Sequence, residues 1–593
     1  MSNTAKSALR GKLRKIFSVF TICIFACSVS IAAGLRFGMT GAVKQKVKEL
    51  DEKALSAKKA KNPPTLPIYS RVYTTLERTV VPVAVPSGSP ALLPHEISKF
   101  SQYGYGIWQF GPGLAPVKRT DLMPTVYSTA TVTNTANLLR FFTMSDIHIQ
   151  DKESPAQMIY FGYNGGNSSA YSPQLLYTTH VLDAAVQTIN ALHKKNQFDF
   201  GIALGDAINN AQYNELRWYI NVIDGKTINP DSGVKDDPVP GPNNDYQDKY
   251  KAAGLDNTIN WYQTLGNHDH AWMGSWPVID YLKQAYTGSK ILLLGPFITE
   301  GIDTRTTYTG AIDGSTPAGE MIGGGLAGSF TTPPTTPADP DRRPLSMKEW
   351  MGEFFTTTSK PVGHGFTQTN LDTGFASYTF EPKSNLPIKV IVLDDTQNED
   401  SSFDFHEQGI IDQQRFDWLV SELDKGQAEG KLMIIAAHIP LIFIDYAHKS
   451  PVPLTTLLAK LHTYPNLLMW ISGHVHRNTV TALKSSDVDN HPELGFWLVE
   501  TSSLKDFPQQ FRTFNIVRNS DNTVSIITTN VDPAVKDGSF VGLSRSYGVA
   551  AYEIFTNNPI FLPPTGSYNA ELIKQLSPEM QAKIQNYGTP IHN

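Results

Sequence analysis

The chain has 593 residues, of which 40% are hydrophobic and 29 are phenylalanine, so it has enough apolar material for a sizeable folded core. Its formal net charge is −5, and the sequence therefore lacks the basic excess that is typical of electrostatic nucleic-acid binders. We expect a globular protein with no specific nucleic-acid binding.

The first 34 residues have the composition of a targeting segment. Basic residues precede an apolar run over 16–34, and small residues at 30–33 close this run. The run is long for a signal peptide and marginal for a membrane span, so it predicts either a cleaved signal peptide or an uncleaved membrane anchor. Either outcome predicts export, to the periplasm or to the medium. Cys23 and Cys27, the only cysteines, both lie here, so we expect no disulfide and no thiolate metal site in the mature chain.

Composition divides the rest of the chain into further segments. Residues 35–65 are rich in lysine and predict a stalk, and residues 66–135 predict an N-terminal arm that packs on the main domain. The main domain is expected over 136–532, with a Gly/Thr/Pro-rich insertion at about 295–385. Residues 533–593 form a C-terminal extension, for which the pattern predicts only a short helix near 570–584.

Within the main domain, apolar segments with the character of buried strands end in polar side chains. Asp146 and His148 follow the first segment, and because they stand two apart in an expected extended segment, they should point to the same side. Five such segments end in side chains of the metal-ligand type. These are Asp146 and His148, Asp206, Asn267, His438, and His474 and His476.

Helices predicted over 177–193, 209–223 and 408–423 separate several of these strands. Such alternation predicts an α/β fold, in which ligands bind at the carboxyl ends of the strands. Glycine precedes Asp206, Asn267 and His474, which favours tight turns and close backbone approach. All the converging donors are oxygen or nitrogen atoms, which suit Mn, Fe or Zn.

Taken in order, these blocks resemble the calcineurin-like metallophosphoesterase superfamily, whose pattern is Asp-x-His, Gly-Asp, Gly-Asn-His-(Asp/Glu), His and Gly-His-x-His. The resemblance covers about residues 138–530 and includes the predicted helix 409–419, which carries Gln-Arg-Phe-Asp-Trp-Leu. It implies a four-layer α/β/β/α sandwich with two divalent transition metal ions. It also implies one metal on Asp146, His148, Asp206 and His476, and another on Asp206, Asn267, His438 and His474, with Asp206 bridging.

The resemblance further implies hydrolysis of phosphate mono- or diesters by direct attack of a metal-bound hydroxide. In this reading His268 donates a proton to the leaving oxygen, and Asp269 orients His268 and favours its protonated form. The alternative is a secreted binding or structural protein on a catalytically inert version of the same fold. Metal content and hydrolysis of an aryl phosphate would distinguish the two.

The match departs from two branches of the superfamily. Purple acid phosphatases carry Tyr three residues after the Gly-Asp aspartate, where this chain has Asn209. The Asp-x-His block is more similar to the cyclic-nucleotide phosphodiesterase branch, but the N-terminal segment and the insertion do not fit a small cytosolic enzyme. The substrate stays open among small-molecule, lipid and nucleotide phosphoesters, and the sequence does not predict an oligomeric state.

Other polar residues near the motifs have simpler interpretations. Asp394 and Asp395 end a further predicted strand, and they are expected either to orient a metal ligand or to bond a helix or loop. His270 and His364 are weaker candidates for substrate contact.

Overall fold

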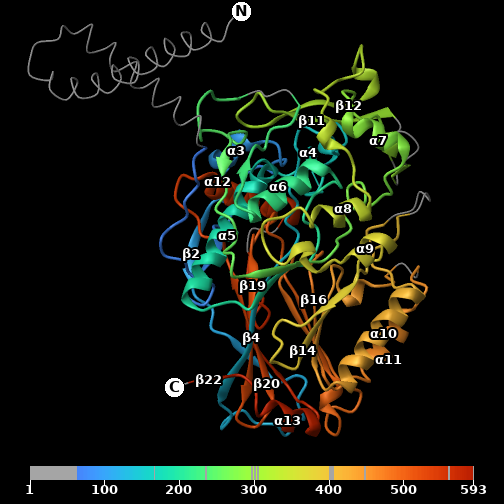
Figure 1. Cartoon of the computed structure of the whole chain (residues 1–593). Coiled ribbons are helices and arrows are strands. Elements are labelled where there is room, and N and C mark those ends of the chain that lie inside the picture. Colours follow the sequence, from blue (N-terminus) through green and yellow to red (C-terminus); the bar gives the residue numbers. More distant parts are fainter. Residues whose placement is uncertain are drawn as a thin grey trace, which may run out of the picture. The chain divides into compact units, whose positions relative to one another are not determined.

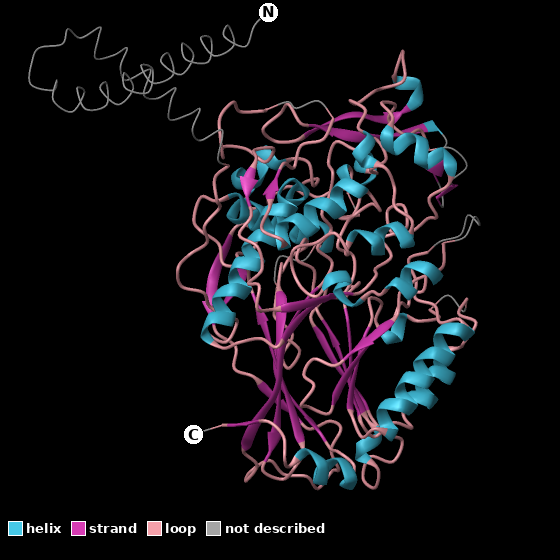
Figure 2. Ribbon diagram, viewed as in Figure 1, coloured by secondary structure: helices cyan, strands magenta, loops and turns pink. Residues whose placement is uncertain are grey.

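The computed structural model describes residues 63–591, except for residue 166 and the segments 234–236, 295–297, 300–301, 304–305, 400–405, 447–448 and 558–560. The expected targeting segment 1–34 with its cysteines, and the predicted stalk before residue 63, lie outside the described residues. The described part has a mixed α/β structure, as predicted from the sequence (Figures 1 and 2). None of its helices is long and apolar enough to cross a membrane.

Two large sheets contain most of the strands. The first has six strands in the order β13-β14-β15-β16-β18-β17. Their bounds are β13 (Tyr378–Phe380), β14 (Ile388–Val392), β15 (Leu432–Ala436), β16 (Leu467–Ser472), β17 (Thr479–Leu483) and β18 (Phe496–Glu500). Its strands β14, β15, β16 and β18 are parallel, so their carboxyl ends lie at one edge of this sheet.

The second sheet has eight strands, in the order β3-β21-β20-β19-β4-β5-β8 with β22 paired to β4. Their bounds are β3 (Val117–Arg119), β4 (Asn134–Met144), β5 (Phe200–Ala203), β8 (Asn260–Gln263), β19 (Phe511–Asn519), β20 (Val524–Val531), β21 (Asn569–Lys574) and β22 (Thr589–Pro590). Strands β4, β5 and β8 are mutually parallel, and their carboxyl ends therefore also share an edge.

The six-stranded sheet is buried on both faces because its side chains alternate between two hydrophobic cores. On β15, Leu432 and Ile434 belong to a core that also contains side chains of the eight-stranded sheet. Met433 and Ile435 belong to the other core, which they share with α10 (Gln413–Ala428) and α11 (Leu454–Leu461). In Figure 1 these two helices run along the side of the sheet that contains β14 and β16.

Aromatic stacking ties the central strands of the eight-stranded sheet together. The ring of Phe141 on β4 stacks on Phe200 of β5 and on Phe514 of β19, with centroids 4.7 and 4.6 Å apart. Such pairs contribute about 0.5–1.5 kcal/mol beyond the burial of their area. Helices α5 (Thr178–Lys195) and α6 (Tyr213–Ile223) bury apolar side chains in the same core.

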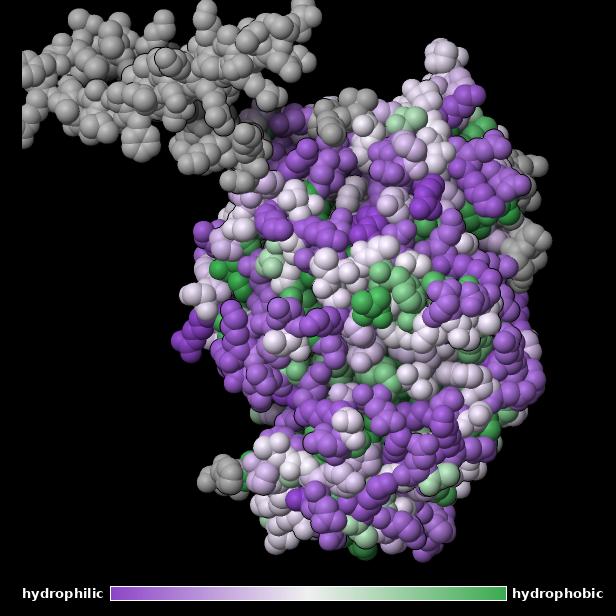
Figure 3. All heavy atoms as spheres, viewed as in Figure 1, coloured by the Kyte–Doolittle hydropathy of each residue, from purple (hydrophilic) through white to green (hydrophobic). Residues whose placement is uncertain are grey.

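The segments outside the two large sheets are shorter elements. In the arm, β1 (Arg78–Pro82) pairs with β2 (Trp108–Pro112), α3 (Ile97–Tyr103) lies between them in sequence, and β3 pairs with β21. The region 295–385 contains the hairpin of β11 (Thr307–Asp313) and β12 (Glu320–Leu326), followed by α8 (Met347–Glu353) and α9 (Gln368–Thr373). The remaining α-helices of the described residues are α4 (Ile159–Tyr163), α7 (Asp280–Thr287), α12 (Phe540–Thr556) and α13 (Pro578–Ile584). Hydrophilic side chains dominate the face shown in Figure 3, with small separate hydrophobic patches.

The helix predicted near 570–584 is wrong in its first half. Residues Asn569–Lys574 form β21, which extends the sheet beside β20 and buries Ala570 and Leu572 in the core. Pairing with β20 satisfies the backbone and outweighs the helical pattern. The helix begins only at Pro578, where the Ser577 side chain accepts the backbone N–H of Met580. The helices predicted over 177–193, 209–223 and 408–423 are present as α5, α6 and α10, with boundaries shifted by a few residues. A strand also precedes each of the predicted ligand positions.

Candidate metal centre

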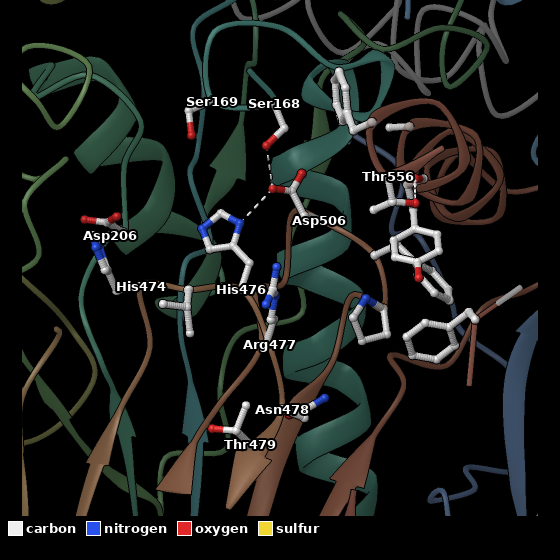
Figure 4. A pocket seen from close by; sticks show the side chains of 18 of the residues that line it. Ser168, Ser169, Asp206, His474, His476, Arg477, Asn478, Thr479, Asp506 and Thr556 are labelled. Atoms are coloured by element: carbon white, nitrogen blue, oxygen red, sulfur yellow. Dashed lines mark hydrogen bonds and ion pairs between the residues drawn. The ribbon is translucent and has the colours of Figure 1, made fainter. Parts of the chain in front are cut away.

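The seven predicted ligands lie together at the ends of β4, β5, β8, β15 and β16. Ligand atoms within 4.8 Å of one another form three groups. These groups are Asp146 with His148 and His476, His148 with Asp206 and His268, and Asp206 with His438 and His474. The described residues therefore include Asp/His clusters of the kind that hold a divalent metal ion. Figure 4 shows part of this site beside the cavity into which it opens.

Unusual backbone conformations distinguish these ligands. Five of the seven have a positive φ, with values of 50° at Asp146, 47° at His148, 50° at Asp206, 69° at His474 and 56° at His476. The left-handed backbone conformation costs a non-glycine residue about 1–3 kcal/mol. Such strain persists only where the surrounding structure imposes it. The expectation of an extended Asp146–His148 segment is therefore wrong. Two left-handed residues bring these side chains together, and the backbone N–H groups of Ile147 and His148 donate to the Asp206 carbonyl.

Close backbone contact explains the glycines that precede three of the ligands. A Cβ atom on Gly473 would lie 1.7 Å from Ser145 Oγ and 2.5 Å from Asp146 Oδ2. A Cβ atom on Gly266 would lie 2.2 Å from the Asp206 backbone nitrogen. The expectation of close approach at these glycines is confirmed.

In the first donor set, two imidazole nitrogens face each other. His148 Nδ1 lies 3.0 Å from Asn209 Oδ1, and His476 Nδ1 lies 2.7 Å from Asp506 Oδ2. Both partners are acceptors, so each Nδ1 donates, and in a neutral imidazole each Nε2 carries a lone pair. The two Nε2 atoms are only 3.2 Å apart, a distance that requires a proton or a cation between them. Asp146 Oδ1 lies 3.3 Å from His476 Nε2, so this donor set fits a cation.

The second donor set is oriented in the same way. His438 Nδ1 donates to the Leu204 carbonyl at 2.7 Å, which directs its Nε2 toward Asp206 Oδ2 at 3.3 Å. The amide of Asn267 donates to the Gly274 carbonyl at 2.8 Å, and its oxygen lies 2.9 Å from His438 Nε2. Such partners fix the orientation of metal ligands. Asp206 Oδ2 also lies 3.6 Å from His148 Nε2, so this carboxylate faces both sets.

The carboxyl and imidazole groups of the cluster shift one another's pKa. Burial alone would raise the pKa of Asp146 and Asp206, but His476 and His438 respectively hold the pKa of each carboxyl below its usual range. Burial acts to lower the pKa of His438 and His476, yet Asp206 and Asp146 raise these values to about 10. Burial lowers the pKa of His474 to about 3. The buried carboxylates thus require cationic partners, and a bound metal ion would take the place of imidazole protons.

His268 and Asp269 have different partners from those expected. His268 Nδ1 lies 2.6 Å from the Asn209 carbonyl, and its backbone N–H donates to Asp206 Oδ1 at 2.8 Å. The carboxylate of Asp269 accepts the backbone N–H groups of Gly266 and Ile208, at 2.8 and 3.2 Å. The His268 ring is thus oriented by the Asn209 carbonyl. Asp269 instead hydrogen-bonds the turns that carry Asn267 and Asp206.

Three residues of the site were not predicted. Asp506 accepts from His476 Nδ1 and from Ser168 Oγ, at 2.7 and 2.8 Å (Figure 4). It also accepts from Gln174 Nε2 at 2.9 Å. Lys505 Nζ donates to the Ser168 carbonyl at 2.8 Å, and burial lowers the pKa of Lys505 to about 8. The only sequence indication of this pair is its position after β18, another parallel strand. Asn209 entered the sequence analysis only as the residue that stands where purple acid phosphatases have tyrosine. In the structure its side chain orients His148.

Asp394, Asp395, His270 and His364, the weaker candidates from the sequence, all contact other groups of the protein. Asp394 pairs with Arg415 of α10 at 2.9 Å, and Asp395 accepts the backbone N–H of Ile439. His270 contacts Thr396 Oγ1 at 3.0 Å. His364 lies 2.8 Å from Thr357 Oγ1.

No model of a known protein family matches this sequence, and no curated protein matches it. Among solved structures, the chain is similar to a dimetal phosphatase from Danio rerio, at a TM-score of 0.34 and 11% sequence identity. The match covers 67% of this chain and 98% of that one. A likeness at this level is too weak to transfer the activity of that protein to this chain.

The contacts around Gly473 give a testable prediction. Gly473→Ala should displace Ser145 or Asp146, because the added methyl group would overlap both side chains. We expect a loss of metal affinity of at least about tenfold, the lower end of what disturbed ligand support costs, measured by chelator competition. Gly352→Ala in α8 is the matched control, since a Cβ atom there meets nothing within 4 Å. Equal metal affinity in the two variants would contradict the prediction.

A second prediction concerns Asp506. Asp506→Asn removes the charge that holds His476 Nδ1–H, and loss of such a partner typically costs about 10–100-fold in metal affinity. Titration of the purified protein with metal should show this weakening, and Asp506→Glu should restore part of it. The control is Asp280→Asn, since the side chain of Asp280 is 92% exposed. Unchanged affinity in Asp506→Asn would show that His476 needs no such support.

Proposed function

We propose that this chain is a calcineurin-like metallophosphoesterase that hydrolyses phosphate mono- or diesters with two divalent transition metal ions, Mn, Fe or Zn. The observation that carries the proposal is the pair of donor sets around one shared carboxylate, Asp206. One set contains Asp146, His148 and His476, and the other contains Asn267, His438 and His474. Two cations that share one carboxylate suit the chemistry of phosphoryl transfer.

We further propose that the main domain is the four-layer α/β/β/α sandwich of this superfamily. The alternation of β15 side chains between a core shared with the eight-stranded sheet and a core shared with α10 and α11 supports this arrangement. Helices α5 and α6 would form the remaining outer layer. In this packing the carboxyl ends of β4, β5 and β8 would lie opposite those of β15 and β16.

The chain's own residues have distinct roles in this mechanism. When bound, the two cations would neutralise phosphate oxygens and lower the pKa of an attacking water. His268 lines the cavity beside Asp206 and Asn267, and since the Asn209 carbonyl occupies its Nδ1, Nε2 is the atom that would protonate the leaving oxygen. Asp269 is a positioning residue, because it acts through the two turns that its carboxylate braces.

We also propose that the protein is exported, to the periplasm or outside the cell, with the N-terminal segment as a cleaved signal or a membrane anchor. The basic residues followed by an apolar run over 16–34 support this proposal. Its substrate would be a small-molecule, lipid or nucleotide phosphoester.

Metal analysis of purified protein tests the proposed centre. We expect about two transition metal ions per chain, one for each donor set. Asp206→Asn should lose at least one ion and nearly all activity, because a shared carboxylate serves both ions. A fully active Asp206→Asn variant would overturn the assignment. Wild-type protein that binds metal but hydrolyses no aryl phosphate would favour the inert alternative.

The role of His268 is tested with two leaving groups. General acid catalysis contributes about 10²–10⁴-fold, so His268→Gln should lose roughly that factor on an alkyl phosphate while metal is retained. The loss should be smaller on a nitrophenyl ester, whose leaving group needs little protonation. His491→Gln is the matched control, since the side chain of His491 is 60% exposed. Equal losses on both substrates would indicate that His268 positions the phosphate instead, and loss of metal would identify it as a ligand.

A further inference from the structure

A cavity of about 1130 Å³ opens from the metal-ligand cluster toward the C-terminal helix α12. Asp206, Asn267 and His474 line its polar end. This volume exceeds the roughly 300–1,000 Å³ of typical small-molecule sites, and is far more than a phosphate group fills. The rest of the space must therefore suit another part of a ligand.

The far wall of the cavity is apolar. It is formed by Phe507, Ala551, Tyr552, Phe555, Phe561 and Leu562. The Phe507 ring lies 5.4 Å from that of Tyr552 and 4.9 Å from that of Phe561, so these three aromatic side chains form one continuous surface. Phe507 is itself buried against Val80 of the arm and Val549 of α12, which fixes the base of the wall.

This wall is joined directly to the metal cluster. Phe507 follows Asp506, whose carboxylate holds His476, so the aromatic surface begins one residue from a ligand support. Figure 4 shows Asp206 and His474 on one side of Asp506, and Thr556 of α12 on the other. A molecule with its phosphate at the ligands would therefore extend along α12.

The rim of the wall is exposed to solvent. Leu562 is 78% exposed, although it stands beside partly buried aromatic residues. Exposed apolar side chains that adjoin a pocket are typical of ligand-binding surfaces. Among the described residues that line this cavity, Arg477 is the only Lys or Arg, so the lining does not suit a polyanion such as a polynucleotide.

We infer that the alcohol portion of the substrate is an extended apolar group, which lies on the wall formed by Phe507, Tyr552, Phe555, Phe561 and Leu562 while the phosphate occupies the ligand cluster. This inference rests on the proposed function and names its substrate class. Selectivity then comes from apolar area removed from water, because each methylene that is fully buried contributes up to about fourfold in binding.

Alkyl phosphates of increasing length test the inference. Methyl, butyl and octyl esters have alcohol leaving groups of similar acidity, so their intrinsic reactivity changes little along the series. Both the monoesters and the corresponding methyl diesters are assayed with metal-loaded full chain, below the concentration at which the octyl compounds form micelles. We expect kcat/KM to rise by at least about tenfold from butyl to octyl, within the ceiling set by four buried methylenes.

Variants locate the effect on the wall. Leu562→Ser and Phe555→Ser should each reduce the octyl-to-methyl ratio of kcat/KM by about threefold or more, mainly through KM. Leu326→Ser is the matched control: Leu326 is 59% exposed on β12 and does not line the cavity, so this change should leave the ratio unaltered. Octylphosphonate, which cannot be hydrolysed, should inhibit the wild type more strongly than methylphosphonate.

The outcomes separate two failures. Hydrolysis of the short esters with no gain from methyl to octyl overturns this inference and leaves the proposed function in place. A length-dependent gain that the wall variants leave unchanged also overturns it, since the apolar group would then bind elsewhere. Absence of hydrolysis for every ester overturns the proposed function and this inference with it.

Discussion

The structure depends on the burial of two carboxylates, Asp146 and Asp206, in one small space. Neither can be buried as an isolated charge, because the loss of hydration would far exceed any gain from packing. The imidazoles around them supply compensating positive charge or, with a metal bound, act with the carboxylates as ligands. Their neighbours are fixed accordingly: each orienting acceptor, from Asn209, Leu204 and Asp506, holds an Nδ1–H so that Nε2 faces inward.

This constraint explains why five of the predicted ligands have a strained backbone conformation. A residue that leaves a parallel strand in an ordinary conformation would continue away from the edge of the sheet. The positive φ values at Asp146, Asp206 and His474 turn the chain so that the side chains converge. The conformational cost, about 1–3 kcal/mol at each residue, is offset by the two well-packed sheets, whose strands are held by burial and stacking far from the site.

The strands and helices of the main domain and the identities of the converging residues could be predicted from the sequence, because strand ends and ordered motifs are local features. The left-handed conformations could not, since only a small fraction of non-glycine residues adopt them, and the residue type alone does not say which. The role of Asp506 as the acceptor for His476 could not be predicted either. Asp506 follows β18, but no sequence spacing links it to His476. Similarly, Asn569–Lys574 became a strand because β20 offered an edge with which to pair, and this is a non-local condition.

Two segments without a recognised motif, the N-terminal arm and helix α12, meet beside the site. Val80 belongs to the N-terminal arm and Val549 to α12, and both pack on Phe507, which follows the acceptor for His476. A change in either segment would therefore alter the contacts of Phe507 and with them the wall of the cavity. If the chain is the phosphoesterase proposed above, such a division would let the sheets maintain one chemistry while the arm and helix α12 determine which alcohol portion fits the cavity.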